Sequence, residues 1–136
     1  MQKLINILLV EDDQLDAIDI KRSLDKLHIF YKLNLVKNGE EALAFLQDNA
    51  EALPDLVLLD INMPRMNGLE LLEVLRGREE WKRLKCFLIT TSDEKVDKDR
   101  AAQLGVSGYI VKPFKINNPS SIDSFNLMID LINMKG

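Results

Sequence analysis

The sequence predicts an α/β fold in which five helices flank a doubly wound, five-stranded parallel sheet. Short apolar runs rich in Ile, Leu and Val alternate along the chain with longer stretches whose apolar residues have helical spacing. One of these runs, residues 55–59, is continuous and bounded by acids, which is typical of a strand covered on both faces. Strand–helix alternation implies parallel strands with right-handed crossovers, and therefore helices on both faces of one sheet.

The first half of the chain predicts two strand–helix units. Residues 4–10 form an apolar run expected to be a buried strand, and residues 13–27 form an amphipathic helix. The apolar residues that have helical spacing in this helix are Leu15, Ile18, Leu24 and Leu27. Residues 31–36 alternate as a strand does. Asn38 and Glu41 then have the spacing of a capping box, which predicts a helix that continues to about residue 48.

The second half predicts the remaining elements. The expected strands are residues 55–59, 86–90 and 108–111, and the expected helices are residues 69–76 and 94–104. A last helix begins at Pro119 and Ser120, with Asp123 at capping-box spacing from Ser120. Its predicted inner face consists of Ile122, Phe125, Met128, Ile129 and Ile132.

Length and composition predict one globular domain, residues 1–136, in the cytoplasm. The chain has 136 residues, of which 46% are hydrophobic and 29% charged. No run of about 18 apolar residues predicts a membrane span, and acids follow the first apolar run too soon for a signal peptide. A net charge of −4 argues against a nucleic-acid-binding surface. Cys86 is the only cysteine, so we expect a buried, inert thiol rather than a disulfide.

Polar residues that could carry chemistry follow the predicted strands. In doubly wound sheets ligands bind beyond the carboxyl ends of the strands. If the first and third strands are neighbours, Glu11, Asp12 and Asp60 converge there and repel one another unless a cation is bound. Carboxylates without His or Cys nearby suit Mg²⁺, which keeps several waters. One acid after a strand is more simply explained by the strand reaching the surface, but three at matched strand ends favour a metal site.

Two further strand ends supply groups that suit a phosphoryl ligand. Thr90 ends the fourth strand with a hydroxyl donor, and Lys112 follows the fifth strand with a cation. With a metal ion, these groups could surround three phosphoryl oxygens beside a carboxylate nucleophile. Phosphoryl transfer needs mainly positioning and charge neutralisation, and this set provides both.

The same segments resemble the motifs of response-regulator receiver domains, and the resemblance covers essentially the whole chain. The four motifs are ILLVEDD (7–13), DLVLLDINMPRMNG (55–68), LITTS (88–92) and GYIVKPF (108–114). The resemblance implies a flavodoxin-like sheet with strand order 2-1-3-4-5. The implied fold is that of chemotaxis-type single-domain regulators, although residues 49–54 and 77–85 look longer than in compact members of that type. These two segments, with residues 11–16 and 88–93, are similar to those of small phytochrome-associated regulators.

The resemblance assigns a role to each site residue. Asp60 would be the phosphoacceptor, Asp12 a direct Mg²⁺ ligand, and Glu11 a ligand through water. The backbone carbonyl of Asn62 would complete the protein's share of the coordination. Lys112 would pair with Asp60 at rest and with the phosphate afterwards, and the Lys112–Pro113 bond would be cis.

The resemblance also implies a switch and its partners. Thr90 would move to hydrogen-bond the phosphate and Tyr109 would rotate inward. The phosphodonor would be a sensor histidine kinase or phosphotransfer protein, and the domain would catalyse its own phosphorylation and dephosphorylation without being an enzyme in the usual sense. Only 24 residues follow Lys112, so no output domain is expected. Output would pass through helix 4, strand 5 and helix 5 to a protein partner, and monomer and homodimer both remain open.

The site residues disfavour three alternative functions. A haloacid-dehalogenase-type phosphatase would have an Asp at the position of Asn62. A flavodoxin-like electron carrier would have a phosphate-binding loop after the first strand, where this chain has acidic residues that would repel a phosphate. A degenerate receiver would lack some of the acceptor, metal acid or lysine. His28, at the end of a helix, is expected to have no phosphate role, and Trp81 is expected to anchor a loop over the core.

Overall fold

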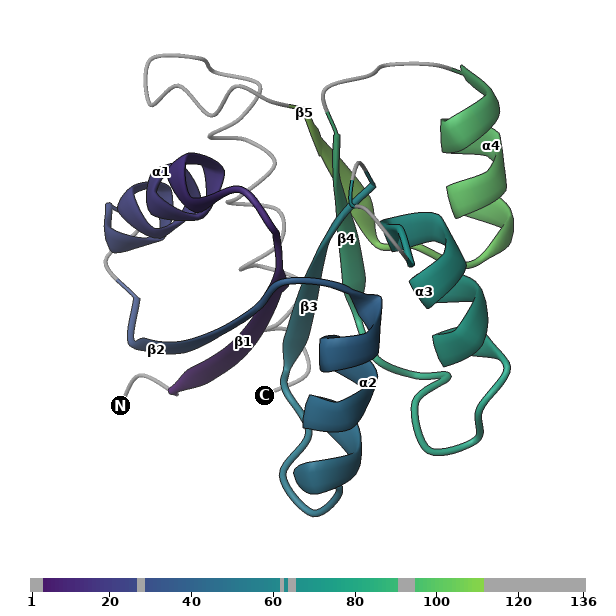
Figure 1. Cartoon of the computed structure of the whole chain (residues 1–136), viewed down its shortest axis with the longest axis horizontal. Helices are drawn as coiled ribbons and strands as arrows, with labels where there is room; N and C mark the ends of the chain where they lie inside the picture. Colours follow the sequence, from purple (N-terminus) through teal and green to yellow (C-terminus); the bar gives the residue numbers. More distant parts are fainter. Residues whose placement is uncertain (1–3, 27–28, 62, 64–65, 91–94, 112–136) are drawn as a thin grey trace.

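The protein is a parallel sheet with helices on both faces (Figure 1). The computed structural model describes residues 4–26, 29–61, 63, 66–90 and 95–111. The strands are β1 (Ile5–Val10), β2 (Tyr31–Val36), β3 (Leu56–Asp60), β4 (Cys86–Thr90) and β5 (Gly108–Val111). The helices described are α1 (Gln14–Asp25), α2 (Gly39–Asp48), α3 (Gly68–Arg76) and α4 (Lys95–Gln103). The strands pair in parallel in the order β2-β1-β3-β4-β5, so the flavodoxin-like arrangement is confirmed.

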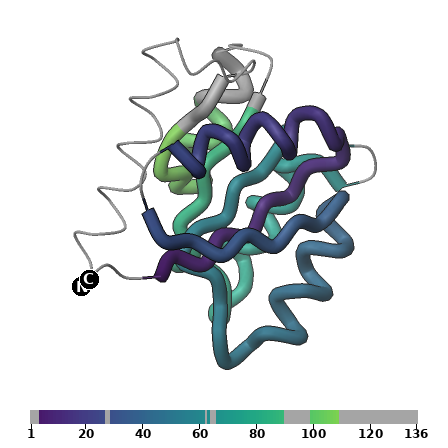
Figure 2. The backbone as a smooth tube through the Cα atoms, turned by 90° about the vertical axis from the view of Figure 1, so that its left-hand side faces the viewer, coloured from purple at the N-terminus to yellow at the C-terminus, as the bar shows by residue number. Residues whose placement is uncertain are grey.

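The alternation of side chains along each strand divides the core into two layers. In β1, Leu8 and Val10 join the cluster that also contains α2 and α3 residues, whereas Ile7 and Leu9 join the cluster beneath α1. Figure 2 shows α1 and α2 on opposite sides of β1 and β2. The residues of β3 are all buried because this strand lies between β1 and β4 with side chains packed on both faces.

The buried face of α1 consists of Ala17, Ile20 and Leu24. Of the apolar residues whose spacing predicted this helix, Leu24 is fully buried, whereas Leu15 and Ile18 are 73% and 46% exposed. Both sets have helical spacing. Helical spacing alone therefore does not decide which apolar residues of α1 face the sheet. Leu27 lies outside the described residues.

Side-chain caps fix where the helices begin. The Asp13 Oδ1 atom accepts hydrogen bonds from the backbone N–H groups of Leu15 (2.9 Å) and Asp16 (3.1 Å) at the start of α1. At α2, the Asn38 side chain accepts from the Glu41 N–H at 2.9 Å, as predicted. The Glu41 carboxylate accepts from the N–H of Lys37 rather than that of Asn38, so the predicted box is displaced by one residue.

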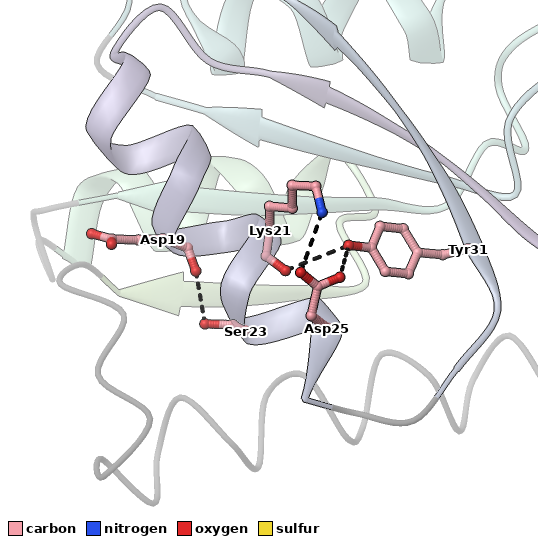
Figure 3. Close-up of polar contacts among 5 residues, drawn as sticks. All are labelled: Asp19, Lys21, Ser23, Asp25 and Tyr31. Carbon is pink, nitrogen blue, oxygen red and sulfur yellow. Dashed lines mark hydrogen bonds and ion pairs between the residues drawn. The ribbon is translucent and has the colours of Figure 1, made fainter.

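A polar cluster joins the end of α1 to the start of β2 (Figure 3). The Tyr31 hydroxyl donates to the Asp25 carboxylate, which also pairs with the Lys21 ammonium at 3.2 Å. The hydrogen bond from Tyr31 lowers the pKa of Asp25. The pKa of Tyr31 is raised, mainly by burial and to a lesser extent by the same hydrogen bond. The Ser23 hydroxyl donates to the Asp19 carbonyl one turn earlier, at 3.0 Å. The cluster therefore holds the two elements together at the amino end of the sheet.

The end of α3 is bound to the turn that follows α4. The Arg76 guanidinium donates to the carbonyls of Leu104 (2.7 Å), Lys82 (3.1 Å) and Gly105 (3.2 Å). Gly105 has φ 72°, and its N–H and that of Val106 bond back to the last turn of α4, which is the Schellman arrangement. The Arg76 side chain thus joins the connection between α3 and β4 to the connection between α4 and β5, at the amino end of the sheet.

Trp81 and Cys86 have the environments predicted for them. Trp81 is 3% exposed and belongs to the core between the sheet and α2 and α3, which confirms it as a loop anchor. Cys86 is buried, and burial raises the pKa of its thiol to about 11, although Arg76 lowers it in part. His28 and the predicted helix after Pro119 lie outside the described residues. In the part of the chain that is described, no helix is long and apolar enough to cross a membrane.

Candidate functional site

Three carboxylates meet at the carboxyl end of the sheet. Ligand oxygens of Glu11, Asp12 and Asp60 all lie within 4.8 Å of one another. Glu11 and Asp60 are each 1% exposed, whereas Asp12 is exposed. The predicted convergence of these acids is therefore observed, with two carboxylates inside the protein and one at its surface.

Sheet pairing explains why the carboxylates converge. Val10 of β1 is paired with Leu59 of β3, so Glu11 and Asp60 each follow one residue later on adjacent parallel strands. The N–H of Glu11 still donates to the carbonyl of Val36 on β2, at 3.0 Å, which extends the ladder to the site. Because β1 is bonded to both of its neighbours here, Glu11 directly follows a fixed strand, and Asp60 is the last residue of another.

The chain turns sharply directly after Glu11. The N–H of Asp13 donates to the Glu11 carboxylate at 3.3 Å, and the Asp13 carboxylate caps α1. Asp13 is thus used by the helix. Of the three consecutive acids after β1, the first two are left to face Asp60.

The other predicted site residues are only partly placed. Asp60 is paired with Ile89, and Thr90 is the next residue and the last of β4, so its backbone lies at the same end of the sheet. Tyr109 lies on β5, where it is paired with Leu88. Asn62 and Lys112 lie outside the described residues.

The donor set fits a hard divalent cation. All ligand atoms are carboxylate oxygens, and no His or Cys is among them. Two buried carboxylates within 4.8 Å of each other repel strongly in a medium of low polarity, and a dication would remove that repulsion. The exposed position of Asp12 leaves the site open to water, as Mg²⁺ requires.

Sequence reasoning missed one residue that lies against this site. Gly68, the first residue of α3, packs on the main chain of Asp60. The capping box formed by Asn67 and Glu70, which fixes this end of α3, was missed as well. Its Asn-x-x-Glu spacing is visible in the sequence and could have signalled it, but the contact of Gly68 has no sequence signal of its own.

Comparisons with known proteins agree with this arrangement. The family model described as the response regulator receiver domain matches residues 7–120. The response regulator Rcp1 of Synechocystis sp. is 34% identical over 110 residues, which covers 78% of this chain and 75% of Rcp1.

Two solved structures show the same likeness in three dimensions. The Mn²⁺-bound form of Rcp1 superposes with a TM-score of 0.75 at 30% identity, covering 93% of this chain and 91% of that one. The bacteriophytochrome response regulator AtBRR has a TM-score of 0.78 at 30% identity, covering 95% and 93% of the two chains. The chemotaxis protein CheY1 of Helicobacter pylori is 34% identical over 110 residues, which covers 81% of this chain and 86% of CheY1. The predicted likeness to chemotaxis-type and phytochrome-associated regulators is therefore confirmed, and neither the phosphatase nor the electron-carrier alternative is supported.

Proposed function

Because the chain belongs to the response regulator receiver family, we propose that it is a response regulator whose Asp60 accepts a phosphoryl group. The observation that carries this proposal is the position of Asp60. It is a nearly inaccessible carboxylate at the carboxyl end of the central strand β3, faced by two more carboxylates. Three carboxylates this close repel one another, and a bound cation would relieve that repulsion.

The cation would be Mg²⁺, held by Asp12 and Asp60 directly, by Glu11 through water, and by the backbone carbonyl of Asn62. These oxygens suit a hard dication, and the related Rcp1 has been solved with Mn²⁺ bound. When bound, the ion neutralises negative charge on the phosphoryl oxygens and on the acids around them. The chain itself holds the carboxylates of Glu11, Asp12 and Asp60 close together at the ends of two adjacent strands.

The proposed reaction is transfer of a phosphoryl group from a phosphohistidine to Asp60. An oxygen of the Asp60 carboxylate forms a bond to phosphorus while the phosphorus–nitrogen bond of the donor breaks, and the histidine leaves as neutral imidazole after taking up a proton. Water later attacks the phosphorus and regenerates the carboxylate with release of phosphate. Lys112 would pair with the phosphoryl oxygens, and Thr90 would donate its hydroxyl to one of them.

Phosphorylation would shift the domain between two conformations. Thr90 would move toward the phosphate and Tyr109 would turn inward, which changes the surface formed by α4, β5 and the chain beyond it. Such coupling is typically worth about 1–3 kcal/mol, or several-fold to about a hundredfold in partner affinity. The partners would be a sensor histidine kinase or phosphotransfer protein upstream and another protein downstream. We propose residues 1–136 as one domain that acts in the cytoplasm, without nucleic acid.

Intact-mass spectrometry after incubation with acetyl phosphate and Mg²⁺ tests this proposal. The wild-type chain should gain one phosphoryl group, and the gain should disappear in EDTA and in Asp60→Asn. Asp48→Asn, a matched change at the exposed end of α2, should behave as wild type. Equal modification of wild type and Asp60→Asn would contradict the proposal, as would failure of folded wild type with both acetyl phosphate and a phosphohistidine donor.

A further inference from the structure

Gly68 lies so close to the end of β3 that a side chain has no room there. A Cβ atom at position 68 would lie 2.6 Å from the main-chain oxygen of Asp60, 3.0 Å from its carbonyl carbon and 3.2 Å from the Cα of Ile61. All three are main-chain atoms, which cannot turn aside as the end of a flexible side chain can. The φ angle of Gly68 is outside the left-handed region, so this position needs glycine for space and not for backbone conformation.

Neither side of this contact can easily retreat. On one side, β3 is bonded to both β1 and β4, and the Ile61 N–H donates to the Ile89 carbonyl at 2.9 Å. On the other side, the Asn67 side chain accepts from the Glu70 N–H at 2.9 Å, which fixes the first turn of α3. The helix is also anchored by its fully buried residues, which are Leu71, Leu72 and Leu75.

We propose that Gly68 is a positioning residue for the cation site. The absence of a Cβ lets the first turn of α3 rest directly on the peptide that carries Asp60. This contact fixes the position of the Asp60 main chain, and therefore of its carboxylate, relative to the carboxylates of Glu11 and Asp12. The proposal rests on the proposed function, because it assumes that the three acids bind a divalent cation.

The size of the expected effect follows from the overlap. Ordinary contacts of a Cβ atom begin at 3.4 Å, so a methyl group at position 68 must displace the Asp60 peptide or the helix start by about 3.4 − 2.6 = 0.8 Å. Cation affinity depends on several oxygens converging on one point, and changes to the groups that orient metal ligands typically weaken binding about 10- to 100-fold. We therefore expect Gly68→Ala to weaken Mg²⁺ binding about tenfold or more.

Calorimetric titration with Mg²⁺ alone, without a phosphodonor, measures this effect. The matched control is Gly77→Ala at the other end of the same helix, where a Cβ would lie 3.5 and 3.6 Å from its nearest neighbours and φ is −84°. Gly77→Ala should bind Mg²⁺ as wild type does. Gly68→Ala should bind about tenfold more weakly while it still unfolds cooperatively in urea. A dissociation constant within twofold of wild type would overturn the proposal.

A double variant separates positioning from general destabilisation. Asn67→Ala releases the first turn of α3, so adding it to Gly68→Ala should relieve the overlap and restore part of the Mg²⁺ affinity, although the protein loses a helix cap. If Gly68 mattered only for stability, the double variant would bind more weakly than Gly68→Ala, and that result would refute a positioning role.

The wild-type chain provides a test that needs no variant. Binding of Mg²⁺ should shift the amide resonances of Asn67 and Gly68 and leave that of Gly77 in place; unchanged resonances at both positions during saturation would also refute the proposal. If the wild-type chain bound no Mg²⁺ at all, the first titration would show it, and the proposed function would fail rather than this inference.

Discussion

Replacing Asp60 with Asn should stabilise the metal-free protein. The three carboxylates lie within 4.8 Å of one another, and Glu11 and Asp60 are both 1% exposed. Two unit charges 4.8 Å apart repel by about 3.5 kcal/mol at an effective dielectric constant of about 20, and by about 0.9 kcal/mol in bulk water. The first value applies to the buried pair with Glu11 and the second to the pair with exposed Asp12. Screening, relaxation and loss of the resting pair that we propose between Asp60 and Lys112 all reduce the sum, so we expect Asp60→Asn to raise the free energy of unfolding by about 1–3 kcal/mol.

Magnesium should reverse this advantage. Wild type should gain about 2.7 kcal/mol of stability when Mg²⁺ is present at about 100 times its dissociation constant. Asp60→Asn should gain much less, because it lacks one charged ligand. Urea unfolding followed by the fluorescence of Trp81, the only tryptophan, measures both states in EDTA and in Mg²⁺.

Asp48→Asn is the matched control for Asp60→Asn, because it removes the same charge at an exposed site. It should change the free energy of unfolding by less than about 0.5 kcal/mol in either buffer. The electrostatic reasoning is refuted if Asp60→Asn is less stable than wild type in EDTA, or if Mg²⁺ stabilises both proteins equally.

Three further predictions concern the scaffold. Arg76→Ala should destabilise the protein by about 2 kcal/mol in urea unfolding, since it leaves three carbonyls without a charged donor. The control variant Arg78→Ala loses only a surface ion pair with Glu80 and should cost less than about 1 kcal/mol. Equal costs for the two variants would contradict the prediction. Asn67→Ala should cost about 1 kcal/mol through loss of the α3 cap, and no change in the urea midpoint would count against it. The Cys86 thiol should react with a disulfide reagent at least about a hundredfold more slowly at pH 8 than in urea, because burial raises its pKa from 9.0 to about 11 and also shields it from the reagent. Fast labelling of the folded protein at pH 8 would contradict this expectation. Between pH 9 and 11 the unfolded chain loses the thiol proton while the folded chain keeps it, so the free energy of unfolding should fall as the pH rises. This fall should be less steep in Cys86→Ala.

Much of the fold could be predicted because its signals are local. The buried strands are apolar runs, and Asp60 ends one of them, so the strand ends and the acids on them were visible in the sequence. Helix and strand limits differ from the predicted ones by about two residues at most. At the helix starts, the first capping interaction of Asn38 was predictable, since it depends on neighbours in the chain.

What could not be predicted depends on contacts between distant segments. Leu15 and Ile18 have the same spacing as the residues that face the sheet, and only packing decides which set is inside. The approach of Gly68 to Asp60 is likewise a result of α3 packing on β3. A glycine that follows an N-cap residue gives no information in the sequence about the main chain that it contacts.

Locating the phosphoryl group tests the central claim most directly. Borohydride reduces an aspartyl phosphate to homoserine, so wild-type protein treated with acetyl phosphate and Mg²⁺ can be reduced, digested and sequenced by tandem mass spectrometry. We expect homoserine at position 60 alone, formed only when Mg²⁺ is present. Homoserine at Asp12 or Asp13 with Asp60 intact would contradict it, because the buried acid on β3 would then not be the acceptor.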